Sequence, residues 1–359
     1  MLYTVTGPAK SPLLQWFAEG LERVLREQGY TYAEPGTPEI KLAINLADAN
    51  NPRPYRRKAQ GTFVASVVEG GEIPEEVLKT TYPLLVRTLS NVLIYLVRAG
   101  DTVHTYFVTL EQGYYPVPFE EEAAYFNHVY RRLAPLATSC LVINNEFHPD
   151  LEEELWEGDE ITQQIYEAGK RLDALNLLPA PFPIHELLSP RDLRHVERLY
   201  GIGGLSYGNL SARKDRTRFW MSASGVNKAN LRVVGQDILL VKGYDAQRNV
   251  ILLSVPPNIK PRRVSVDAIE HWMIYTEHPQ VGAIVHVHAW MEGVPSTEVN
   301  YPCGTLELAK AVAELVRRAE DPSRAVVGLR NHGLTITGPN LQDIFERIEG
   351  RIIRQVPMS

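Results

Sequence analysis

The sequence predicts an α/β protein built from two domains. Its 359 residues exceed what one small hydrophobic core organises, and helical and strand-like patterns alternate along the chain. Four prolines in LLPAPFPIHELLSP (177–190) interrupt these patterns, because proline breaks both helices and strands. We therefore expect an α+β N-terminal domain over 1–180, of unknown role, and a layered α/β/α domain over 185–359.

In the first half, apolar residues recur alternately at helical and at strand spacing. The stretch 82–100 is the most apolar, but Arg87 and Arg98 interrupt it, so we interpret it as a core helix rather than a membrane span. The expected helices are 12–29, 82–100, 120–136 and 160–176, and the expected strands are 39–48, 61–71, 102–110 and 139–147.

The second half opens with a predicted helix and a glycine-rich turn over 201–213. Strands flanked by helices follow, which is the pattern of a sheet covered on both faces. The expected helices are 189–201, 265–278, 305–319 and 341–355, and the expected strands are 218–224, 236–243, 249–254, 282–288, 325–330 and 334–338.

Composition excludes several classes of protein. The net charge is −6 and the pI is near 6.0, so the chain lacks the basic surface that nucleic acid or anionic membranes require. The two cysteines, Cys140 and Cys303, fall in what look like separate domains, so a disulfide framework is not expected. The N-terminus lacks the pattern of a signal peptide. We expect a soluble cytoplasmic protein with no nucleic-acid or membrane partner.

Two histidines stand two residues apart in the predicted strand IVHVH (284–288). Alternate side chains of a strand share one face, so His286 and His288 lie about 6.6 Å apart along the chain on the same side. Two imidazoles placed in this way can bind one metal ion at about 2.0–2.1 Å. A half-buried histidine pair without a ligand would give the same pattern.

A third histidine, His332, lies in RNHGLTITG (330–338), at a predicted tight turn where we expect Gly333 to adopt a positive φ. Three neutral imidazoles would leave the charge of a divalent ion uncompensated and one position open for water or substrate, which describes a Lewis-acid site. The alternative is that His332 only caps the turn.

Taken in order, a set of motifs in the second half resembles the class II (metal-dependent) aldolase/adducin family, over about residues 190–355. The resemblance implies a largely antiparallel central sheet and a divalent metal ion on the three histidines, most often Zn²⁺, with Mn²⁺, Co²⁺ or Ni²⁺ as other candidates. The N-terminal half is not recognised. The motifs are GNLSAR (208–213), SASG (222–225), HVH (286–288), YPCGTLELAKAV (301–312) and RNHGLTITG (330–338).

The resemblance also implies a substrate-binding set. It comprises Asn209 of the GNxS turn, Ser224 and Gly225 of SASG, and Ser265 before the family's acid. Turn N–H groups and hydroxyls of this kind bind anions such as phosphate. The family has a second serine after Ser265, but this chain has Val266, which removes one expected phosphate ligand.

The family's acid/base glutamate lies four residues before a helical histidine. Counting back from His271 gives Asp267, one methylene shorter, as the catalytic candidate. A structural role is the alternative, because with Ser265 as N-cap Asp267 would lie in the first helical turn, where the helix dipole favours a carboxylate. Glu270, one turn later, is the second candidate.

The segment between HVH and YPCGT is shorter than the family's, so the wall of the site on that side is reduced or supplied by another element, for which the N-terminal half is a candidate. The resemblance further implies a homo-oligomer, a tetramer in the family, with active sites at subunit interfaces.

These features predict a metal-dependent lyase or isomerase, of the aldolase type or a related epimerase, dehydratase or decarboxylase. Its substrate would be a small hydroxy-carbonyl compound, sugar-like or sugar-phosphate-like, reacting through a metal-stabilised enediolate. The alternative is a non-catalytic, adducin-like binding or scaffold protein on the same fold. For the N-terminal half, a regulatory or oligomerising role stays open.

One basic run remains outside this interpretation. RPYRRK (53–58) would suit a phosphate or nucleotide tail, but a solvated loop would have the same composition.

Overall fold

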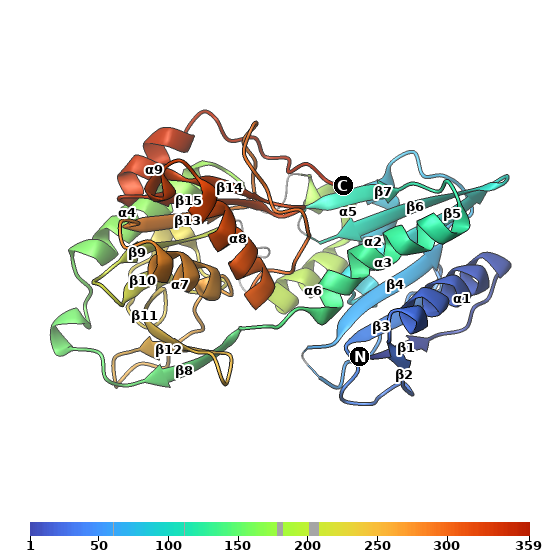
Figure 1. Cartoon of the computed structure of the whole chain (residues 1–359), viewed down its shortest axis with the longest axis horizontal. Coiled ribbons are helices and arrows are strands. Elements are labelled where there is room, and N and C mark those ends of the chain that lie inside the picture. The colour runs from blue at the N-terminus through green and yellow to red at the C-terminus, as the bar shows by residue number, and fades with distance from the viewer. Residues whose placement is uncertain (60, 111, 178–181, 201–207) are drawn as a thin grey trace. The chain divides into compact units, whose positions relative to one another are not determined.

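The computed structural model describes residues 1–59, 61–110, 112–177, 182–200 and 208–359 (Figure 1). The chain forms two compact units. The first contains residues 1–138, 182–196 and 358–359, and the second contains residues 139–181 and 197–357. The first division, between residues 138 and 139, falls earlier in the chain than the proline-rich run at 177–190.

The N-terminal unit is built on a seven-stranded sheet with the strand order β2-β1-β3-β4-β5-β6-β7. Its elements are β1 (Leu2–Thr6), α1 (Pro12–Glu27), β2 (Thr31–Tyr32), β3 (Leu42–Ala47), β4 (Phe63–Glu69), α2 (Val77–Thr88), β5 (Val92–Ala99), β6 (Thr102–Thr109), β7 (Gly113–Val117), α3 (Glu122–Thr138), α5 (Ile184–Leu187) and the first part of α6 (Pro190–Tyr200).

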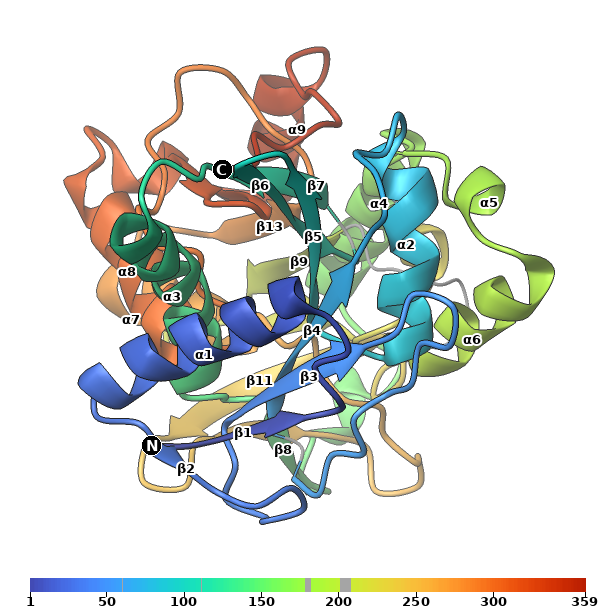
Figure 2. The ribbon, with the colours of Figure 1, turned by 90° about the vertical axis from the view of Figure 1, so that its right-hand side faces the viewer.

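Strands β2, β1, β3, β4 and β5 pair in parallel, and β6 and β7 add antiparallel pairs. In Figure 2, α1 and α3 cover one face of this sheet and α2 covers the other. The parallel strands β3 and β4 are buried almost throughout, which explains their nearly continuous apolar sequences.

The predicted core helix over 82–100 is wrong in its second half. Helix α2 ends at Thr88, Leu89 follows in the left-handed conformation (φ 52°), and the chain re-enters the sheet as β5 between β4 and β6. A continuous apolar run carries no periodicity that separates a buried strand from a buried helix. The β-branched and aromatic residues of VLIYLV favour the strand.

The C-terminal unit is built on an eight-stranded sheet with the order β14-β15-β13-β9-β10-β11-β12-β8. Its pairs are antiparallel, apart from the parallel pair of β12 with β8, as the predicted sheet requires. Its elements are β8 (Asn144–His148), η1 (Glu153–Leu155), α4 (Glu160–Ala174), β9 (Gly208–Arg213), β10 (Phe219–Ser222), η2 (Lys228–Asn230), β11 (Ile238–Asp245), β12 (Val250–Ser254), α7 (Ala268–Glu277), β13 (Ala283–Val287), α8 (Leu306–Arg318), η3 (Pro322–Arg324), β14 (Val326–Leu329), β15 (Gly333–Gly338) and α9 (Leu341–Ile348).

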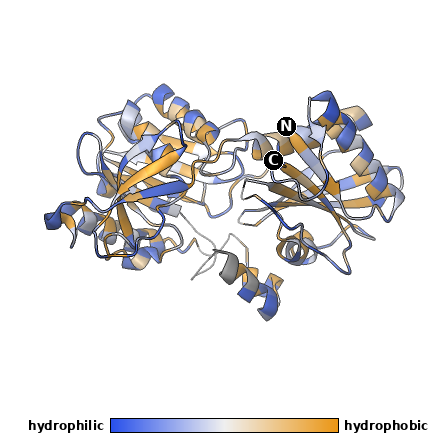
Figure 3. Cartoon of the chain, turned by 90° about the horizontal axis from the view of Figure 1, so that it is seen from below, coloured by the Kyte–Doolittle hydropathy of each residue, from blue (hydrophilic) through white to orange (hydrophobic). Residues whose placement is uncertain are grey.

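Helices α7 and α8 pack together on one face of this sheet, and α4 and α9 pack together on the other, which gives the predicted three layers. In Figure 3 the strands are mostly coloured as hydrophobic and the outer turns of the helices as hydrophilic. No helix in the described ranges combines the length and the apolar character that a membrane crossing requires.

Three further predictions need correction. Residues 208–213 form strand β9 rather than a turn, while residues 201–207 of the same predicted turn lie outside the described residues. The last helix ends at Ile348, shortly before Gly350 with its φ of 75°. Cys140 and Cys303 lie in the same unit rather than in separate domains, and neither forms a disulfide bond.

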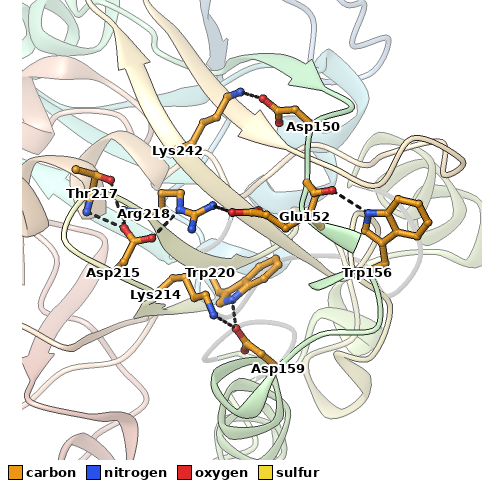
Figure 4. Close-up of polar contacts among 11 residues, drawn as sticks. Asp150, Glu152, Trp156, Asp159, Lys214, Asp215, Thr217, Arg218, Trp220 and Lys242 are labelled. Carbon is orange, nitrogen blue, oxygen red and sulfur yellow. Dashed lines mark hydrogen bonds and ion pairs between the residues drawn. The ribbon is translucent and has the colours of Figure 1, made fainter. Parts of the chain in front are cut away.

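Ion pairs attach the segment 139–177 to the C-terminal sheet (Figure 4). Asp159 is the centre of one group: it caps α4 in a capping box with Thr162, and its carboxylate accepts hydrogen bonds from Lys214 Nζ (2.8 Å) and Trp220 Nε1 (3.1 Å). Arg218 links Asp215 and Glu152 in the same region. These contacts explain why the segment belongs to the C-terminal unit.

Replacing Asp159 with alanine tests this attachment. Asp159→Ala removes the helix cap and leaves the indole N–H of buried Trp220 without its acceptor, so we expect a loss of about 2–4 kcal/mol in the free energy of unfolding. Urea denaturation followed by tryptophan fluorescence measures the loss. The exposed neighbour Glu160→Ala is the control, and an equal effect of the two changes would contradict the assignment.

Candidate metal centre and acid/base site

The site is organised by the pairing of β13 with the strands on either side of it. In that register His286 lies directly opposite Asn209 of β9 and Thr335 of β15. Directly opposed residues of neighbouring strands point to the same face of a sheet. The polar side chains of this row meet residues from the start of α7, where Asp267 and Glu270 lie.

The three predicted metal ligands come together at one end of this row. His286, His288 and His332 each offer a ring nitrogen within 4.8 Å of the other two. The Nε2 atoms of His286 and His332 are 3.2 Å apart, and their rings are stacked with centroids 5.0 Å apart. His288 follows the last residue of β13, and His332 lies in the turn between β14 and β15.

The left-handed residue of that turn is Asn331 (φ 56°), contrary to the prediction for Gly333. Gly333 serves a different purpose: a Cβ there would lie 2.1 Å from the carbonyl oxygen of Val287. Glycine at this position therefore allows β15 to approach the end of β13 closely.

The donor set fits a divalent metal ion. Tetrahedral coordination at about 2.0–2.1 Å separates two nitrogen ligands by roughly 3.3 Å, close to the observed 3.2 Å. His286 Nδ1 lies 2.9 Å from the carbonyl oxygen of Leu334 and donates to it, which leaves Nε2 with its lone pair directed at the cluster. Burial lowers the pKa values of His286 and His332 to about 4, so both imidazoles are neutral near pH 7. Three protein ligands leave a fourth position for water or substrate.

Asp267 lies beside the histidines and is 5% exposed. Asn209 Nδ2 donates to its Oδ2 over 2.6 Å. Burial raises the pKa of Asp267, and the nearby His332 and the Asn209 hydrogen bond oppose that rise. Helix α7 begins at Ala268, and Asp267, rather than Ser265 as predicted, takes the N-cap position without making a side-chain capping bond. The carboxylate therefore faces Asn209 rather than the helix N–H groups.

Glu270 is a second buried carboxyl, 2% exposed, one turn further along α7. Thr335 Oγ1 donates to its Oε1, while Oε2 has no hydrogen-bond partner among the described residues. Burial and then the neighbouring Asp267 raise the pKa of Glu270 to about 8. The site thus keeps two carboxyls in a setting that favours their protonated forms.

The resemblance covers Ser211 as the last residue of the GNxS motif, but the sequence did not indicate its contact with the ring of His271. His271 Nδ1 lies 2.7 Å from Ser211 Oγ, and Ser211 Oγ also lies 2.8 Å from the hydroxyl of Tyr275. Burial and then the nearby His286 lower the pKa of His271 to about 3, so its ring is neutral. Only the pairing of β9 with β13 places Ser211 under α7, and residue spacing along the chain does not carry that information.

The other predicted substrate residues, Ser224, Gly225 and Ser265, lie where the end of β10 is hydrogen-bonded to the segment 263–265. Ser224 N donates to Arg263 O, and Ser265 N donates to Ser222 O, so the end of β10 runs beside residues 263–265. Ser224 is exposed, Gly225 adopts a φ of 67° and Ser265 is buried.

The shortened segment after HVH folds back onto its own unit. Trp290 exchanges two backbone hydrogen bonds with Ile353 of the C-terminal tail, and Thr297 N donates to Gly328 O of β14. A Cβ on Gly328 would lie 2.3 Å from the Trp290 ring. Residues of β14 and of the tail therefore support this side of the unit.

The C-terminal unit thus brings three histidines and two buried carboxyls together on a three-layer α/β/α fold. The family profile of the "Class II Aldolase and Adducin N-terminal domain" matches residues 194–294, within the part of the chain where the resemblance to that family was predicted. No family profile matches the N-terminal half.

Individual relatives are similar over the same part of the chain. A methylthioribulose-1-phosphate dehydratase of Klebsiella pneumoniae is 25% identical over 172 residues, which cover 40% of this chain and 79% of the relative. A 3-oxo-tetronate 4-phosphate decarboxylase of Haemophilus influenzae is 26% identical over 185 residues, 46% of this chain and 81% of the relative. Among solved structures, L-fuculose-1-phosphate aldolase of Thermus thermophilus aligns with a TM-score of 0.32 and 21% identity, covering 52% of this chain and 86% of that structure.

Removal of one histidine tests the metal site. We expect His288→Ala to lower the metal content of the purified protein from about one ion per chain to a small fraction of that, because two imidazoles no longer complete the donor set. Elemental analysis by mass spectrometry measures the content. His148→Ala, which changes a histidine paired with Glu146 outside the cluster, is the control. Full metal content in His288→Ala would reject the site.

The raised pKa of Glu270 predicts a pH dependence of stability. The folded protein holds a proton on Glu270 up to about pH 8, whereas the unfolded chain releases it near the ordinary value of 4.5. The unfolded state therefore binds fewer protons between these values, and stability falls as the pH rises through that window. Glu270→Gln carries no titrating group at this position. We therefore expect its stability to fall less steeply with pH than that of the wild type, and its melting temperature at pH 8 to be higher than that of the wild type.

Thermal unfolding in the presence of a chelator, between about pH 5 and pH 8, measures this difference without a contribution from bound metal. Exposed Glu292→Gln is the matched control. Parallel pH profiles for the wild type and Glu270→Gln would refute the assignment.

Proposed function

We propose that the C-terminal unit is a metal-dependent lyase or isomerase that acts on a small hydroxy-carbonyl compound, sugar-like or sugar-phosphate-like. The observation that carries this proposal is the convergence of three imidazoles beside the buried carboxyl of Asp267. The names of the similar proteins, which include a dehydratase and a decarboxylase of phosphorylated compounds, agree with it.

In this proposal His286, His288 and His332 hold the metal, and zinc suits three imidazole ligands best. A divalent ion bound there supplies Lewis-acid chemistry toward a carbonyl oxygen. His286 keeps its orientation through Leu334, so the ligand set is fixed before substrate arrives.

Asp267 is the acid/base group. Its raised pKa lets the carboxyl hold a proton closer to neutral pH than an exposed aspartate does, which suits transfer to and from a carbon or oxygen next to a carbonyl. Asn209 donates to Oδ2 and holds the carboxyl in place. Asn209 Oδ1 is buried without a partner among the described residues and is available to a substrate hydroxyl.

Glu270 affects the charge next to Asp267. Kept neutral by burial and by Asp267, it places no second negative charge beside the acid/base group. Ser224, Gly225 and Ser265 are the proposed contacts for the far end of the substrate. Because Val266 lacks a hydroxyl, we propose that the anchoring of a phosphate is weaker here than in the phosphosugar enzymes of the family. We further propose that the chain forms a homo-oligomer, a tetramer by family resemblance.

Asp267→Asn tests the acid/base role. We expect kcat to fall by about 10²–10⁴-fold on ketoses and their phosphates, because the amide cannot accept the proton. Metal content should stay at the wild-type level, since Asp267 is not one of the three clustered ligands. The exposed change Asp321→Asn is the control.

Two other outcomes would redirect the proposal. Unchanged turnover in Asp267→Asn would assign proton transfer to another group, with Glu270 the nearest candidate. A wild-type protein that binds metal stoichiometrically but turns over none of the ketoses, aldoses or their phosphates would favour the non-catalytic binding protein.

A further inference from the structure

The N-terminal sheet contains a topological switch point between β1 and β3. The chain leaves β1 through α1 towards β2 on one side, and leaves β3 towards β4 on the other. The parallel strand order β2-β1-β3-β4-β5 is a doubly wound arrangement. In such sheets the loops that leave two adjacent strands in opposite directions open a crevice at their carboxyl ends, and small ligands bind there.

A cavity of about 920 Å³ occupies this position. Residues 6–11 after β1 and residues 48–58 after β3 line it, and the end of β4 closes one side at Glu69 and Gly70. Its volume lies within the range of about 300–1,000 Å³ that is typical of sites for cofactors and other small ligands. Figure 2 shows β1, β3 and β4 side by side with α1 across one face.

The loop after β1 depends on a glycine. Gly7 adopts a φ of 84°, and a Cβ there would lie 2.1 Å from the carbonyl oxygen of Leu46 at the end of β3. The loop can therefore lie directly against the neighbouring strand. Ser11, which lines the cavity, caps α1 by accepting a hydrogen bond from Leu14 N (3.1 Å). This hydrogen bond ties the end of the loop to the helix.

The loop after β3 is fixed at two points. Asn45, 6% exposed at the end of β3, donates to the carbonyl oxygen of Arg53 (3.0 Å) and to Ser66 Oγ (2.8 Å). The guanidinium of Arg57 donates to the carbonyl oxygens of Thr62 and Leu89. The basic run 53–58 is therefore a positioned segment, in contrast to the freely solvated loop that its composition also allowed.

The charges around the cavity are unequal. Its lining includes the cations Lys10, Arg53, Arg56 and Lys58 but only two carboxylates, Asp48 and Glu69. Lys10 pairs with Asp48 (2.7 Å), and Ser11 Oγ donates to Glu69. Within the described part of the chain, Arg53, Arg56 and Lys58 make no ion pair. The cavity thus keeps an excess of positive charge in a protein whose net charge is −6.

We propose that the N-terminal unit binds a phosphorylated small molecule, up to the size of a nucleoside diphosphate, in the β1/β3 cavity, with its phosphoryl groups on Arg53, Arg56 and Lys58. Guanidinium groups bind phosphate in a bidentate manner, and three cations on a short anchored segment match two adjacent phosphoryl groups. The concave shape and the acidic balance of the chain favour a small ligand over a nucleic acid. This site is independent of the proposed function of the C-terminal unit.

Calorimetric titration of the full chain tests the site, in the presence of a chelator so that metal on the histidines cannot bind the probe. ADP and inorganic pyrophosphate are the two probes, and adenosine is the uncharged comparison. We expect at least one of the anions to bind with a Kd below about 1 mM and adenosine to bind much more weakly, because charge-assisted hydrogen bonds supply the affinity. Tighter binding of ADP indicates a nucleotide-like ligand, and equal or tighter binding of pyrophosphate indicates a smaller phosphorylated compound.

The triple change Arg53→Gln/Arg56→Gln/Lys58→Gln should weaken binding of the better anion by about tenfold or more, with unchanged thermal unfolding because these side chains are exposed. The matched control Arg23→Gln/Lys79→Gln/Arg131→Gln removes the same charge from other exposed positions of the unit and should bind normally. His288→Ala should also bind normally. Absence of binding by both anions, equal loss in the control, or loss in His288→Ala would overturn the proposal.

Discussion

The C-terminal site depends on the close approach of β9 and β15 to the strand between them, β13. A Cβ on Gly208 would lie 2.1 Å from the His286 carbonyl oxygen, and one on Gly333 would lie 2.1 Å from that of Val287. Glycines therefore flank β13 on both sides where it ends. They hold the register that sets His286 between Asn209 and Thr335, and a one-residue slip would turn His286 to the other face of the sheet.

Burial then gives this polar row its chemical character. It disfavours every charged form, so the imidazoles lose their protons and the carboxyls tend to keep theirs. Neutral imidazoles are the form that binds metal, and carboxyls with raised pKa values are the form that exchanges protons near neutral pH. One physical cause, burial, thus acts on both kinds of group.

The sequence predicted the features that residue chemistry and periodicity both indicate. It did not predict the features that depend on how strands pair in the folded chain. HVH in an apolar run, and His332 before a glycine, marked the donor set that the structure brings together. The N-cap was predicted two residues too early, because Ser265 and Asp267 are both good N-cap residues. In the structure Asp267 takes that position, and its carboxylate accepts a hydrogen bond from Asn209. Strand β5 was hidden because a fully buried strand has no alternation, and β1 because five residues are too few for a periodic signal.

The two units use the same backbone device for different ligand chemistry. In each, a glycine whose Cβ would lie 2.1 Å from a neighbouring carbonyl oxygen lets a loop or strand end lie against the adjacent strand: Gly7 on Leu46 in one unit, Gly333 on Val287 in the other. The side chains near each glycine determine the ligand. The N-terminal loops carry cations that outnumber their carboxylates, which suits the proposed anionic ligand. In the C-terminal unit His332 of the turn meets His286 and His288, which suits the proposed metal ion. The same backbone device therefore serves two proposed sites of unlike chemistry, one in each unit.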